Sequence, residues 1–432
     1  MIWNKETECM TRSEMENLQL ERLKKIVRHA YDNAAYYRAK MDAVKVTPDD
    51  IKTLSDVNKL PFTTKEDIRD NYPLGMLAVP KKDIVRIHAS SGTTGKQKIL
   101  GYTRGDLEVW SECAARCMAM AGVGEDDVLQ VAYGYGLFTG GLGAHAAGEK
   151  VGAMVVPMST GNTKKLITLM LDLDVTAIAC TPSYLLHIAE VLEENDLIGK
   201  IKLKTAICGA EPWTENMRRE IEAKLHCKAF DIYGLTEMMG PGVACDCEAR
   251  NGLHICEDHF LPEIIDENTL EPIAAGETGE LVFTTLTKMG QPLIRYRTRD
   301  LTSLSYEPCS CGRTTARISR FKGRSDDMLI IRGVNVFPSQ IEAALLEVEE
   351  ATPYYFINVD RVNNMDTLEI LVELKEQYYS DEIRDMEKIA AKIANSVKQT
   401  IGLAAKIKLV EPNSIERSMG KAVHVSDKRK FD

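Results

Sequence analysis

Short apolar runs alternate with helical segments between residues 128 and 234, and this alternation constrains the fold more than any other feature of the chain. The runs are "VLQVAY", "VGAMVVPM", "VTAIAC", "LKTAICG" and "CKAFDIYG". Parallel strands need crossover connections, which are usually helices. The sequence therefore predicts an α/β fold with a mostly parallel sheet covered by helices.

Other segments extend this pattern in both directions. Apolar residues at helical spacing from Leu18 to Ala34 predict an amphipathic helix near the start. Thr103 and Asp106 have the spacing of a capping box, so we expect a helix from there to about Gly122. From about residue 242 to 310, "EDHFLPEIID" and "GETGELVFTTLT" predict a β-rich subdomain.

The pattern changes again beyond Gly323, which predicts a second domain. A compact strand–helix–strand–strand–helix–strand unit follows, in which "YYFINVD" and "TLEILVEL" are the clearest strands and Asp381 to Gln399 is the clearest helix. "FKGRSDD" contains the expected boundary. We therefore predict a large N-terminal domain over residues 1–323 and a small α+β domain over residues 324–432.

Composition excludes several classes of protein. The 432 residues are 44% hydrophobic and 27% charged, which is typical of a soluble globular protein. A net charge of −10 argues against binding nucleic acid or an anionic membrane. The N-terminal "MIWNKETECM" lacks the apolar core of a signal peptide, and eleven cysteines fit reduced thiols. We expect a cytoplasmic protein.

The stretch "SSGTTGK", residues 90 to 96, follows "DIVRIHA", which we interpret as a buried strand. It fails the Walker pattern at both ends, where Ser90 and Gln97 stand. Its glycines still allow close backbone approach, and its hydroxyls and lysine can bind phosphate. A surface turn of small residues is the alternative for this stretch taken alone.

Four distant segments favour the phosphate interpretation. "DIYGLTE" ends a predicted strand with the carboxylate Glu237, and "YRTRD" ends in Asp300, which could accept hydrogen bonds from a ribose. "GRSDDMLIIRG" lies at the predicted domain boundary. "RSMGKAVHV" carries a single lysine, Lys421, near the C-terminus.

Together these segments resemble the adenylate-forming superfamily of acyl-CoA synthetases, luciferases and adenylation domains. The phenylacetate–CoA ligase family is the most similar, on "SSGTTGK", "AYGYGLFTGGLG", "YGLTEMMGPGV", "PLIRYRTRDLTSL" and "GRSDDMLIIRGVNVFPSQIE". The resemblance covers essentially the whole chain. It implies an AMP-forming acid–thiol ligase, which uses ATP to convert an aryl carboxylic acid into an acyl adenylate and then transfers the acyl group to coenzyme A.

The resemblance also implies residue roles. Glu237 would hold Mg²⁺, an ion that prefers oxygen ligands, and Thr236 would contact the α-phosphate. Lys421 would bridge the substrate carboxylate and the α-phosphate, and Asp326 would be the hinge of a mobile C-terminal domain. The remaining ATP-binding residues would be Ser90, Ser91, Gly92, Thr93, Thr94, Gly95 and Lys96 at the phosphates, Gly209, Ala210, Glu211, Pro212, Asp231 and Tyr233 at adenine, and Asp300 and Arg324 at the ribose.

The acid pocket is expected in "AYGYGLFTGGLGAHAAG". Tyr135, Phe138 and Gly140 suit a flat aromatic ring, although core packing is an alternative for both rings. Ala146, Gln97 and His424 depart from the family pattern, where a bulkier aromatic, a proline and an arginine are expected. The identity of the aryl acid therefore stays open.

A second set of residues has the chemistry of a structural zinc site. "CDCEARNGLHIC" and "CSCGR" together offer five cysteines and a histidine. Because residues two apart on a strand share a face, Cys245 competes with Cys247, and Cys256 competes with His254. The family pattern keeps the second cysteine and the histidine, which implies the set Cys247, His254, Cys309 and Cys311. Buried, metal-free cysteines are the alternative.

Two other functions remain open from the sequence. One is an adenylating enzyme that passes its acyl group to a carrier-protein thiol. The other is a catalytically silent nucleotide-binding regulator, against which the presence of both Glu237 and Lys421 argues. The family resemblance also implies a homodimer. We assign no residues to coenzyme A, because the sequence has no clear local signature for it.

Overall fold

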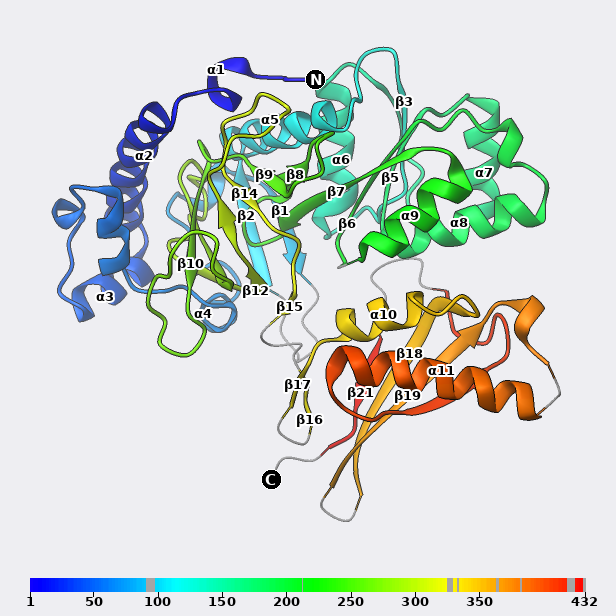
Figure 1. Cartoon of the computed structure of the whole chain (residues 1–432). Helices are drawn as coiled ribbons and strands as arrows, with labels where there is room; N and C mark the ends of the chain where they lie inside the picture. The colour runs from blue at the N-terminus through cyan, green and yellow to red at the C-terminus, as the bar shows by residue number, and fades with distance from the viewer. Residues whose placement is uncertain are drawn as a thin grey trace. The chain divides into compact units, whose positions relative to one another are not determined.

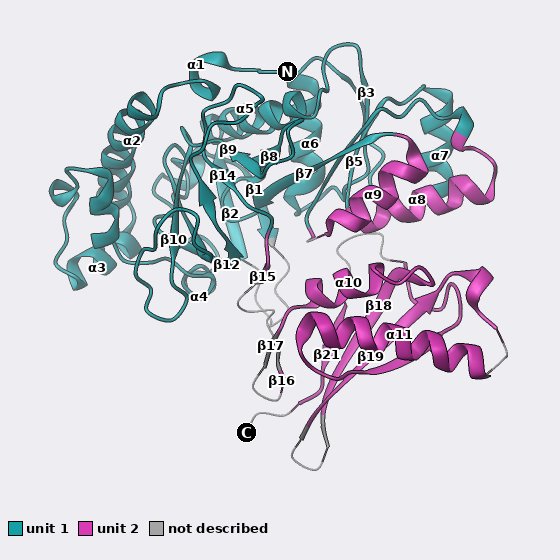
Figure 2. Ribbon diagram, in the orientation of Figure 1, with its two compact units in different colours: residues 1–181, 199–210, 227–320 teal, residues 182–198, 211–226, 321–432 magenta. Residues whose placement is uncertain are grey.

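The computed structural model describes residues 1–90, 98–211, 213–324, 329–331, 334–362, 365–380, 383–417 and 424–429 (Figure 1). These residues form two compact units (Figure 2). Unit 1 contains residues 1–181, 199–210 and 227–320, and unit 2 contains residues 182–198, 211–226 and 321–432. The predicted boundary at residues 323 and 324 stays a prediction, since unit 2 also includes two earlier segments of the chain.

A nine-stranded sheet forms the centre of unit 1. Its order is β13-β14-β9-β8-β7-β6-β5-β3-β4, and the strands from β7 to β4 are parallel to one another. All five apolar runs that predicted strands lie in this parallel part, so the predicted α/β fold class is confirmed. The bounds are β3 (Val128–Val131), β4 (Met154–Val156), β5 (Ala177–Cys180), β6 (Thr205–Gly209), β7 (Lys228–Leu235), β8 (Gly240–Asp246), β9 (Leu253–Ile255), β13 (Leu304–Ser305) and β14 (Arg317–Ile318).

The helices of unit 1 begin where the sequence provides caps. Thr11 and Thr103 each accept a backbone hydrogen bond at the start of a long helix and complete a capping box with Glu14 and Asp106. Both predicted helices are therefore confirmed, as α2 and α5. The bounds are α1 (Lys5–Glu8), α2 (Arg12–Asn33), α3 (Ala35–Ala43), η1 (Pro48–Asp50), η2 (Leu54–Lys59), α4 (Lys65–Asp70), η3 (Lys81–Asp83), α5 (Arg104–Met120), α6 (Thr139–Lys150) and α7 (Thr163–Asp172).

The strand predicted at "DIVRIHA" forms, but its burial was predicted wrongly. β1 (Ile84–Ser90) pairs with β2 (Lys98–Thr103) in a two-stranded antiparallel sheet outside the central one. Val85 is 52% exposed and Ile87 is 41% exposed, whereas His88 and Ala89 are buried. A two-stranded ribbon has one face free for solvent, so its alternate side chains need not be covered.

Unit 1 contains antiparallel strands in the region that was predicted to be rich in β-structure, from about residue 242 to 310. β10 (Phe260–Ile265), β11 (Gly279–Thr285) and β12 (Tyr296–Thr302) pair antiparallel in that order. All seven residues of β11 are buried, as expected for the middle strand. Across the described residues of both units, no helix is long and apolar enough to cross a membrane.

Unit 2 has a four-stranded sheet of order β20-β19-β18-β21. Its core combines residues from β18, β19, α10 and α11, among them Ile357, Ile370, Leu345 and Val397. The strands predicted at "YYFINVD" and "TLEILVEL" are confirmed as β18 and β19. The helix predicted over residues 381–399 is confirmed as α11, and residues 381 and 382 lie outside the described part of the chain. The bounds are α8 (Pro182–Glu194), α9 (Glu215–Leu225), β15 (Gly323–Arg324), β16 (Leu329–Ile331), β17 (Val334–Val336), α10 (Pro338–Leu346), β18 (Ala351–Val362), β19 (Met365–Leu374), η5 (Glu376–Tyr378), α11 (Ile383–Ile401), β20 (Lys406–Val410) and β21 (Val425–Asp427), and η4 (Ile198–Lys200) joins the units.

Candidate active site and cysteine–histidine cluster

The segment that follows β7 carries the central residues of the candidate site. β7 pairs antiparallel with β8, with an irregular register at Tyr233 and Gly234. A Cβ added at Gly234 would lie 1.9 Å from the carbonyl oxygen of Gly240, so only glycine fits at this crossing. This close approach forms a tight β7–β8 connection that contains Thr236 and Glu237.

Glu237 is a buried carboxylate with a cationic partner. Its side chain is 7% exposed, and its Oε1 lies 2.5 Å from Nζ of Lys98, the first residue of β2. The Thr236 hydroxyl lies 3.4 Å from that of Thr139, the first residue of α6. The N-terminal end of a helix dipole favours anions. A carboxylate, a hydroxyl and an ammonium group thus lie on adjacent elements.

Two further side chains hold the backbone of this segment. The wholly buried Lys288 donates from Nζ to the carbonyl oxygen of Glu237, at 2.8 Å. The Tyr102 hydroxyl donates to the carbonyl oxygen of Thr236, at 2.8 Å. Burial lowers the pKa of Lys288 to about 8, although the negative charges of Asp106 and Glu237 oppose that shift. Both contacts are with main-chain carbonyl groups and do not involve the side chains of Thr236 and Glu237.

The structure brings together two of the residues that were predicted to bind the nucleoside, Tyr233 and Asp300. The Tyr233 hydroxyl donates to Oδ2 of Asp300 at 2.6 Å, which joins β7 to β12. Asp300 is 6% exposed. The backbone N–H of Asp231 donates to Asp246 at 3.1 Å on the neighbouring strand. Tyr233 and Asp300, 67 residues apart in the chain, therefore form one hydrogen-bonded pair.

The turn predicted to bind adenine, residues 209–212, begins in unit 1 and ends in unit 2. Gly209 ends β6 in unit 1, and Ala210 has a left-handed backbone with φ of 73°. In unit 2, Oε1 of Glu211 accepts the backbone N–H of Ser183 at 2.7 Å. Pro212 lies outside the described residues. A role of this turn in binding adenine stays a prediction.

The segment predicted to form the acid pocket is attached to β1. The carbonyl oxygen of Leu137 accepts the N–H of Ala89 at 2.9 Å and lies 3.0 Å from Nδ1 of His88. Tyr135 is half-buried, and its hydroxyl lies 3.3 Å from Nδ1 of His145. Phe138 is 54% exposed, so core packing is the wrong interpretation of that ring. A Cβ at Gly140 would lie 3.3 Å from the Tyr133 side chain, so larger residues are not easily accommodated there.

Several predicted site residues lie outside the described part of the chain. Ser90 ends β1 and Arg324 ends β15, and only their backbones are described. The others are Ser91, Gly92, Thr93, Thr94, Gly95, Lys96, Asp326 and Lys421. Their assigned roles therefore rest on the sequence.

The predicted metal ligands converge in space. One ligand atom from each of Cys247, His254, Cys309 and Cys311 lies within 4.8 Å of every other. Sγ of Cys247 is 3.7 Å from Sγ of Cys309, and Sγ of Cys311 is 3.4 Å from Nε2 of His254. A tetrahedral zinc ion with ordinary bond lengths separates two sulfurs by about 3.8 Å, and a sulfur from a nitrogen by about 3.6 Å. The four residues therefore have the chemistry and spacing of a zinc site.

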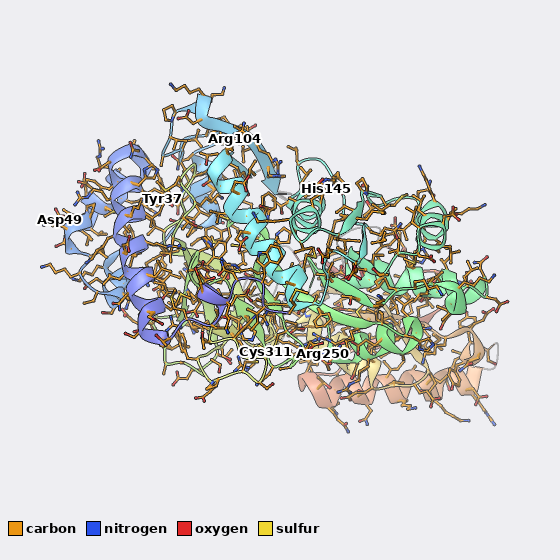
Figure 3. The ribbon with its side chains drawn as sticks, turned by 90° about the horizontal axis from the view of Figure 1, so that it is seen from above. Tyr37, Asp49, Arg104, His145, Arg250 and Cys311 are labelled. Atoms are coloured by element: carbon orange, nitrogen blue, oxygen red, sulfur yellow. The ribbon has the colours of Figure 1, made fainter. Side chains whose placement is uncertain are left out.

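Neighbouring groups orient these ligands. Nδ1 of His254 lies 2.9 Å from the hydroxyl of Thr315, which directs Nε2 toward Cys311. Burial disfavours the Cys311 thiolate, but hydrogen bonds from His254 and Arg313 outweigh it and lower the pKa of Cys311 to about 5. Figure 3 labels Cys311 and Arg250. The backbone N–H of Arg250 donates to the carbonyl oxygen of Cys247 at 3.0 Å, in the turn between β8 and β9.

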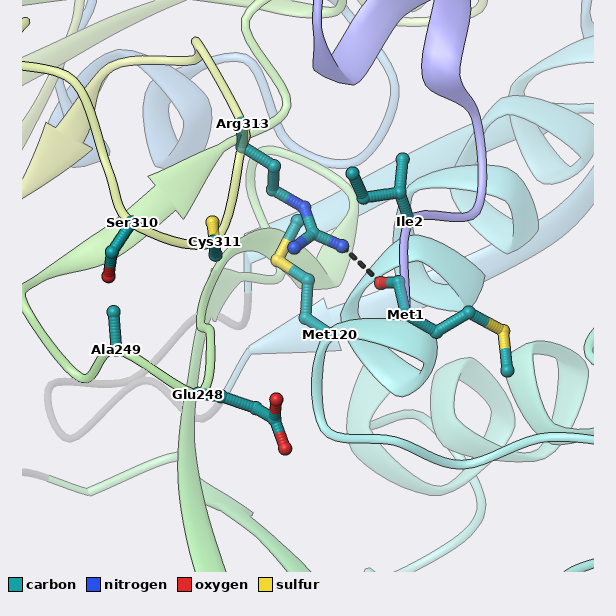
Figure 4. A pocket seen from close by; sticks show the side chains of 8 residues that line it. All are labelled: Met1, Ile2, Met120, Glu248, Ala249, Ser310, Cys311 and Arg313. Atoms are coloured by element: carbon teal, nitrogen blue, oxygen red, sulfur yellow. Dashed lines mark hydrogen bonds between the residues drawn. The ribbon is translucent and has the colours of Figure 1, made fainter.

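Cys311 also lines a pocket of about 360 Å³ beside this cluster (Figure 4). Arg313 crosses one side of the pocket, where its guanidinium donates to the carbonyl oxygen of Met1 and pairs with Glu8 at 2.5 Å. Met1, Glu248 and Ser310 are among the other lining residues. The N-terminal segment is thus attached to the loop that carries Cys309 and Cys311.

Of the eight cysteines outside the cluster, seven are buried and Cys9 is half-buried. None of the eleven cysteines, all of which lie among the described residues, forms a disulfide. Cys113 and Cys117 on α5 are buried, and their carbonyl oxygens lie 3.9 Å and 3.7 Å from the thiols of Cys256 and Cys245. Cys245 and Cys256 therefore contact α5 and are not among the four clustered ligands, as predicted.

Sequence reasoning missed three residues of the candidate site, Lys98, Lys288 and Tyr102. Lys98 closely follows "SSGTTGK", and its charge near a phosphate loop was an available signal. Lys288 and Tyr102 gave no comparable signal, because their contacts are with the backbone of residues 51 and 134 positions away.

Comparisons with known proteins identify the family of this chain. A family model of AMP-binding enzymes matches residues 15–289, and one of the AMP-binding enzyme C-terminal domain matches residues 333–429. A phenylacetate–coenzyme A ligase of Escherichia coli (strain K12) is 49% identical over 420 residues, 96% of this chain and 95% of that protein. The chain belongs to the phenylacetate–coenzyme A ligase family. Another ligase of that name, from Thermus thermophilus, is 45% identical over 445 residues, 100% of both chains.

Solved structures support the predicted fold. A 2-hydroxyisobutyryl-CoA ligase in the postadenylation state, in complex with an acyl adenylate (R3-HIB-AMP), superposes with a TM-score of 0.93. That chain is 29% identical, and the match covers 99% of this chain and 92% of the other. The predicted adenylate-forming fold and the predicted phenylacetate–CoA ligase family are both confirmed.

Proposed function

We propose that this protein is an ATP-dependent ligase that joins a phenylacetate-like aryl acid to coenzyme A. In the first step a carboxylate oxygen attacks the α-phosphorus of ATP, and pyrophosphate leaves, which gives the acyl adenylate. In the second step the coenzyme A thiol loses its proton and attacks the acyl carbon, and AMP leaves with the electron pair of its acyl–oxygen bond. The observation that carries this proposal is the 49% identity over 96% of the chain to a phenylacetate–coenzyme A ligase.

The contacts around Glu237 support the first step. The buried Glu237 carboxylate is a suitable ligand for Mg²⁺, which when bound would neutralise phosphate charge as pyrophosphate leaves. The Thr236 hydroxyl would donate to the α-phosphate. Lys98, now paired with Glu237, carries a positive charge that the phosphates of ATP could share. Lys421 would bridge the acid and the α-phosphate during adenylation.

Other roles follow from the same resemblance. Asp300, held by the Tyr233 hydroxyl, would accept ribose hydroxyl hydrogen bonds, with Arg324 near the ribose and phosphate. Gly209 to Pro212 and Asp231 would contact adenine, and Ser90 to Lys96 would cover the β- and γ-phosphates. Tyr135, Phe138 and Gly140 would contact the aryl ring. Rotation about Asp326 would exchange the catalytic groups between the two steps.

We also propose that Cys247, His254, Cys309 and Cys311 bind a structural zinc ion. The support is their mutual spacing within 4.8 Å and the contact of His254 with Thr315. Four protein ligands leave no open coordination position, so zinc bound there would fasten the β8–β9 hairpin to the residue 309–311 loop and would not enter the reaction. The homodimeric state and the cytoplasmic location stay predictions from the sequence.

The test is AMP formation from ATP with a panel of aryl acids, including phenylacetate and indoleacetate, with and without coenzyme A. We expect turnover that needs both an aryl acid and coenzyme A. We also expect Glu237→Gln to lower that turnover by about 100-fold or more, because it removes a charge that stabilises the transition state. ATP binding without turnover on any acid would contradict the proposal. It would favour a carrier-protein acceptor or a silent nucleotide-binding regulator.

A further inference from the structure

Lys288 is a fully buried lysine that the proposed mechanism does not use. Its side chain is 0% exposed, and its ammonium lies 4.6 Å from the centre of the Tyr102 ring. An ammonium group buried away from water is costly unless it is paired and hydrogen-bonded. The Lys288 ammonium is in hydrogen-bond contact with the Glu237 carbonyl oxygen, 2.8 Å away.

Tyr102 makes the equivalent contact one residue earlier. Its hydroxyl donates to the Thr236 carbonyl oxygen at 2.8 Å, and the ring itself is fully buried. Two adjacent carbonyl groups are therefore fixed by two side chains that also contact each other. The two peptide groups flank the Cα of Glu237, so holding both fixes the direction in which its side chain leaves the backbone, and holding the first also restricts Thr236.

The turn that contains Lys288 is itself anchored. Asp106 is 1% exposed and accepts the backbone N–H groups of Met289 at 2.7 Å and Gly290 at 3.0 Å. The same carboxylate accepts the N–H of Thr103, which caps α5. A Cβ at Gly290 would lie 2.7 Å from Asp106, so a side chain there would disturb this contact. The position of Lys288 is thus set by the start of α5 and the end of β2.

We propose that Lys288 and Tyr102 are positioning residues for adenylation, which orient the Glu237 carboxylate and the Thr236 hydroxyl toward Mg·ATP by holding their carbonyl groups. This proposal rests on the proposed function of Glu237 and Thr236. Mg²⁺ requires nearly ideal octahedral geometry, so a small displacement of a ligand weakens it strongly. A displacement of about 1 Å in an active site can cost about 100-fold in rate.

The main test uses Lys288→Met, which keeps an unbranched side chain that is one atom shorter and removes the ammonium. We expect the kcat of pyrophosphate release to fall by about 30- to 100-fold, and the Mg²⁺ concentration for half-maximal rate to rise by about tenfold. The KM for the aryl acid should stay within about twofold. The unfolding midpoint should change by only a few degrees, because an apolar side chain removes the cost of burying a charge.

Two more variants make the test specific. Tyr102→Phe removes only the hydroxyl, and we expect a fall in kcat of about fivefold to tenfold, consistent with one hydrogen bond. Lys40→Met is the matched control, because Lys40 also donates to a carbonyl, that of Phe62 at 2.8 Å, and lies 5.2 Å from a tyrosine ring. Lys40→Met should leave kcat and the Mg²⁺ dependence unchanged.

A binding measurement separates this proposal from the proposed function. Binding of Mn²⁺ with a non-hydrolysable ATP analogue, followed by electron paramagnetic resonance, should be about tenfold weaker in Lys288→Met than in the unmodified protein. Wild-type Mn²⁺ binding and kcat in folded Lys288→Met or Tyr102→Phe would overturn the positioning role. If Lys288→Met does not fold, Tyr102→Phe decides the question. Absence of turnover in the unmodified protein would overturn only the proposed function.

Discussion

Nζ of Lys98 lies 2.5 Å from Oε1 of Glu237, and only 16% of the lysine side chain is exposed. The partner that sequence reasoning assigned to this carboxylate was Mg²⁺. In the structure, the ammonium group of Lys98 at the start of β2 neutralises the same charge. Under the proposed function, Mg²⁺ would replace Lys98 as the positive partner of Glu237 when Mg·ATP binds.

Lys98→Met tests that exchange. Without nucleotide we expect a loss of about 3 kcal/mol in stability, because the buried Glu237 carboxylate loses its Lys98 partner. Mg·ATP should then raise the unfolding midpoint more in Lys98→Met than in the unmodified protein, since the metal would replace the missing cation. Lys228→Met is the control, because Lys228 pairs with Glu248 at 3.2 Å on the surface. Equal gains in the midpoint with Mg·ATP would contradict the exchange.

Tyr233→Phe tests the proposed ribose site. The variant loses a 2.6 Å hydrogen bond to Asp300, and a hydrogen bond to a charged group is worth about 1.5–3 kcal/mol. We expect the KM for ATP to rise by about tenfold or more, with the KM for the aryl acid unchanged. Tyr31→Phe is the matched control, since Tyr31 donates to Asp42 at 2.8 Å on the exposed surface. A normal KM for ATP in Tyr233→Phe would count against Asp300 as the ribose ligand.

The cysteine–histidine cluster predicts about one zinc ion per chain. Elemental analysis of Cys309→Ser should show that zinc is lost, and its unfolding midpoint should fall because the hairpin and the 309–311 loop lose their common anchor. Cys9→Ser is the control, since Cys9 is only half-buried and lies outside the cluster. The kcat of folded Cys309→Ser should be close to that of the unmodified protein. A purified chain that contains no zinc after growth with zinc would refute the site.

We expect the stability of the folded state to depend on pH through Glu342. Burial, and next the like charge of Glu211, raise the pKa of Glu342 to about 8 from 4.5. Below pH 4.5 the folded and unfolded states both carry the proton. As the pH rises from there, only the folded state keeps it, and that state loses stability by up to about 1.4 kcal/mol per pH unit until the pH passes about 8.

The measurement compares Glu342→Gln with the unmodified protein in denaturant at about pH 5 and about pH 9, which bracket most of that range. The variant keeps a neutral partner for the Tyr355 hydroxyl, 3.4 Å away, so it should gain relative stability as the pH rises. Glu349→Gln is the control, because Glu349 accepts the Tyr378 hydroxyl at 2.9 Å on the surface. A stability difference that does not change with pH would show that Glu342 titrates normally.

The positions of the secondary structure elements were predictable where the pattern is local. Thr11 and Thr103 set helix starts through contacts three residues away, and the apolar runs set the parallel strands. The error at β1 has a physical cause. "DIVRIHA" is apolar enough for a central strand, but its pairing with β2 alone leaves Val85 and Ile87 exposed.

The sequence by itself determined the fold class, the family and the set of residue types that can bind phosphate and metal. It also predicted which four of the competing residues lie together, because strand alternation and the family pattern limit which of them can share a site. These are Cys247, His254, Cys309 and Cys311. Only the tertiary structure decided that Lys98 pairs with Glu237 and that Lys288 and Tyr102 hold its backbone. Those contacts join residues 51 to 139 positions apart, and a lysine that will donate to a distant carbonyl has the same local sequence signal as one in solvent.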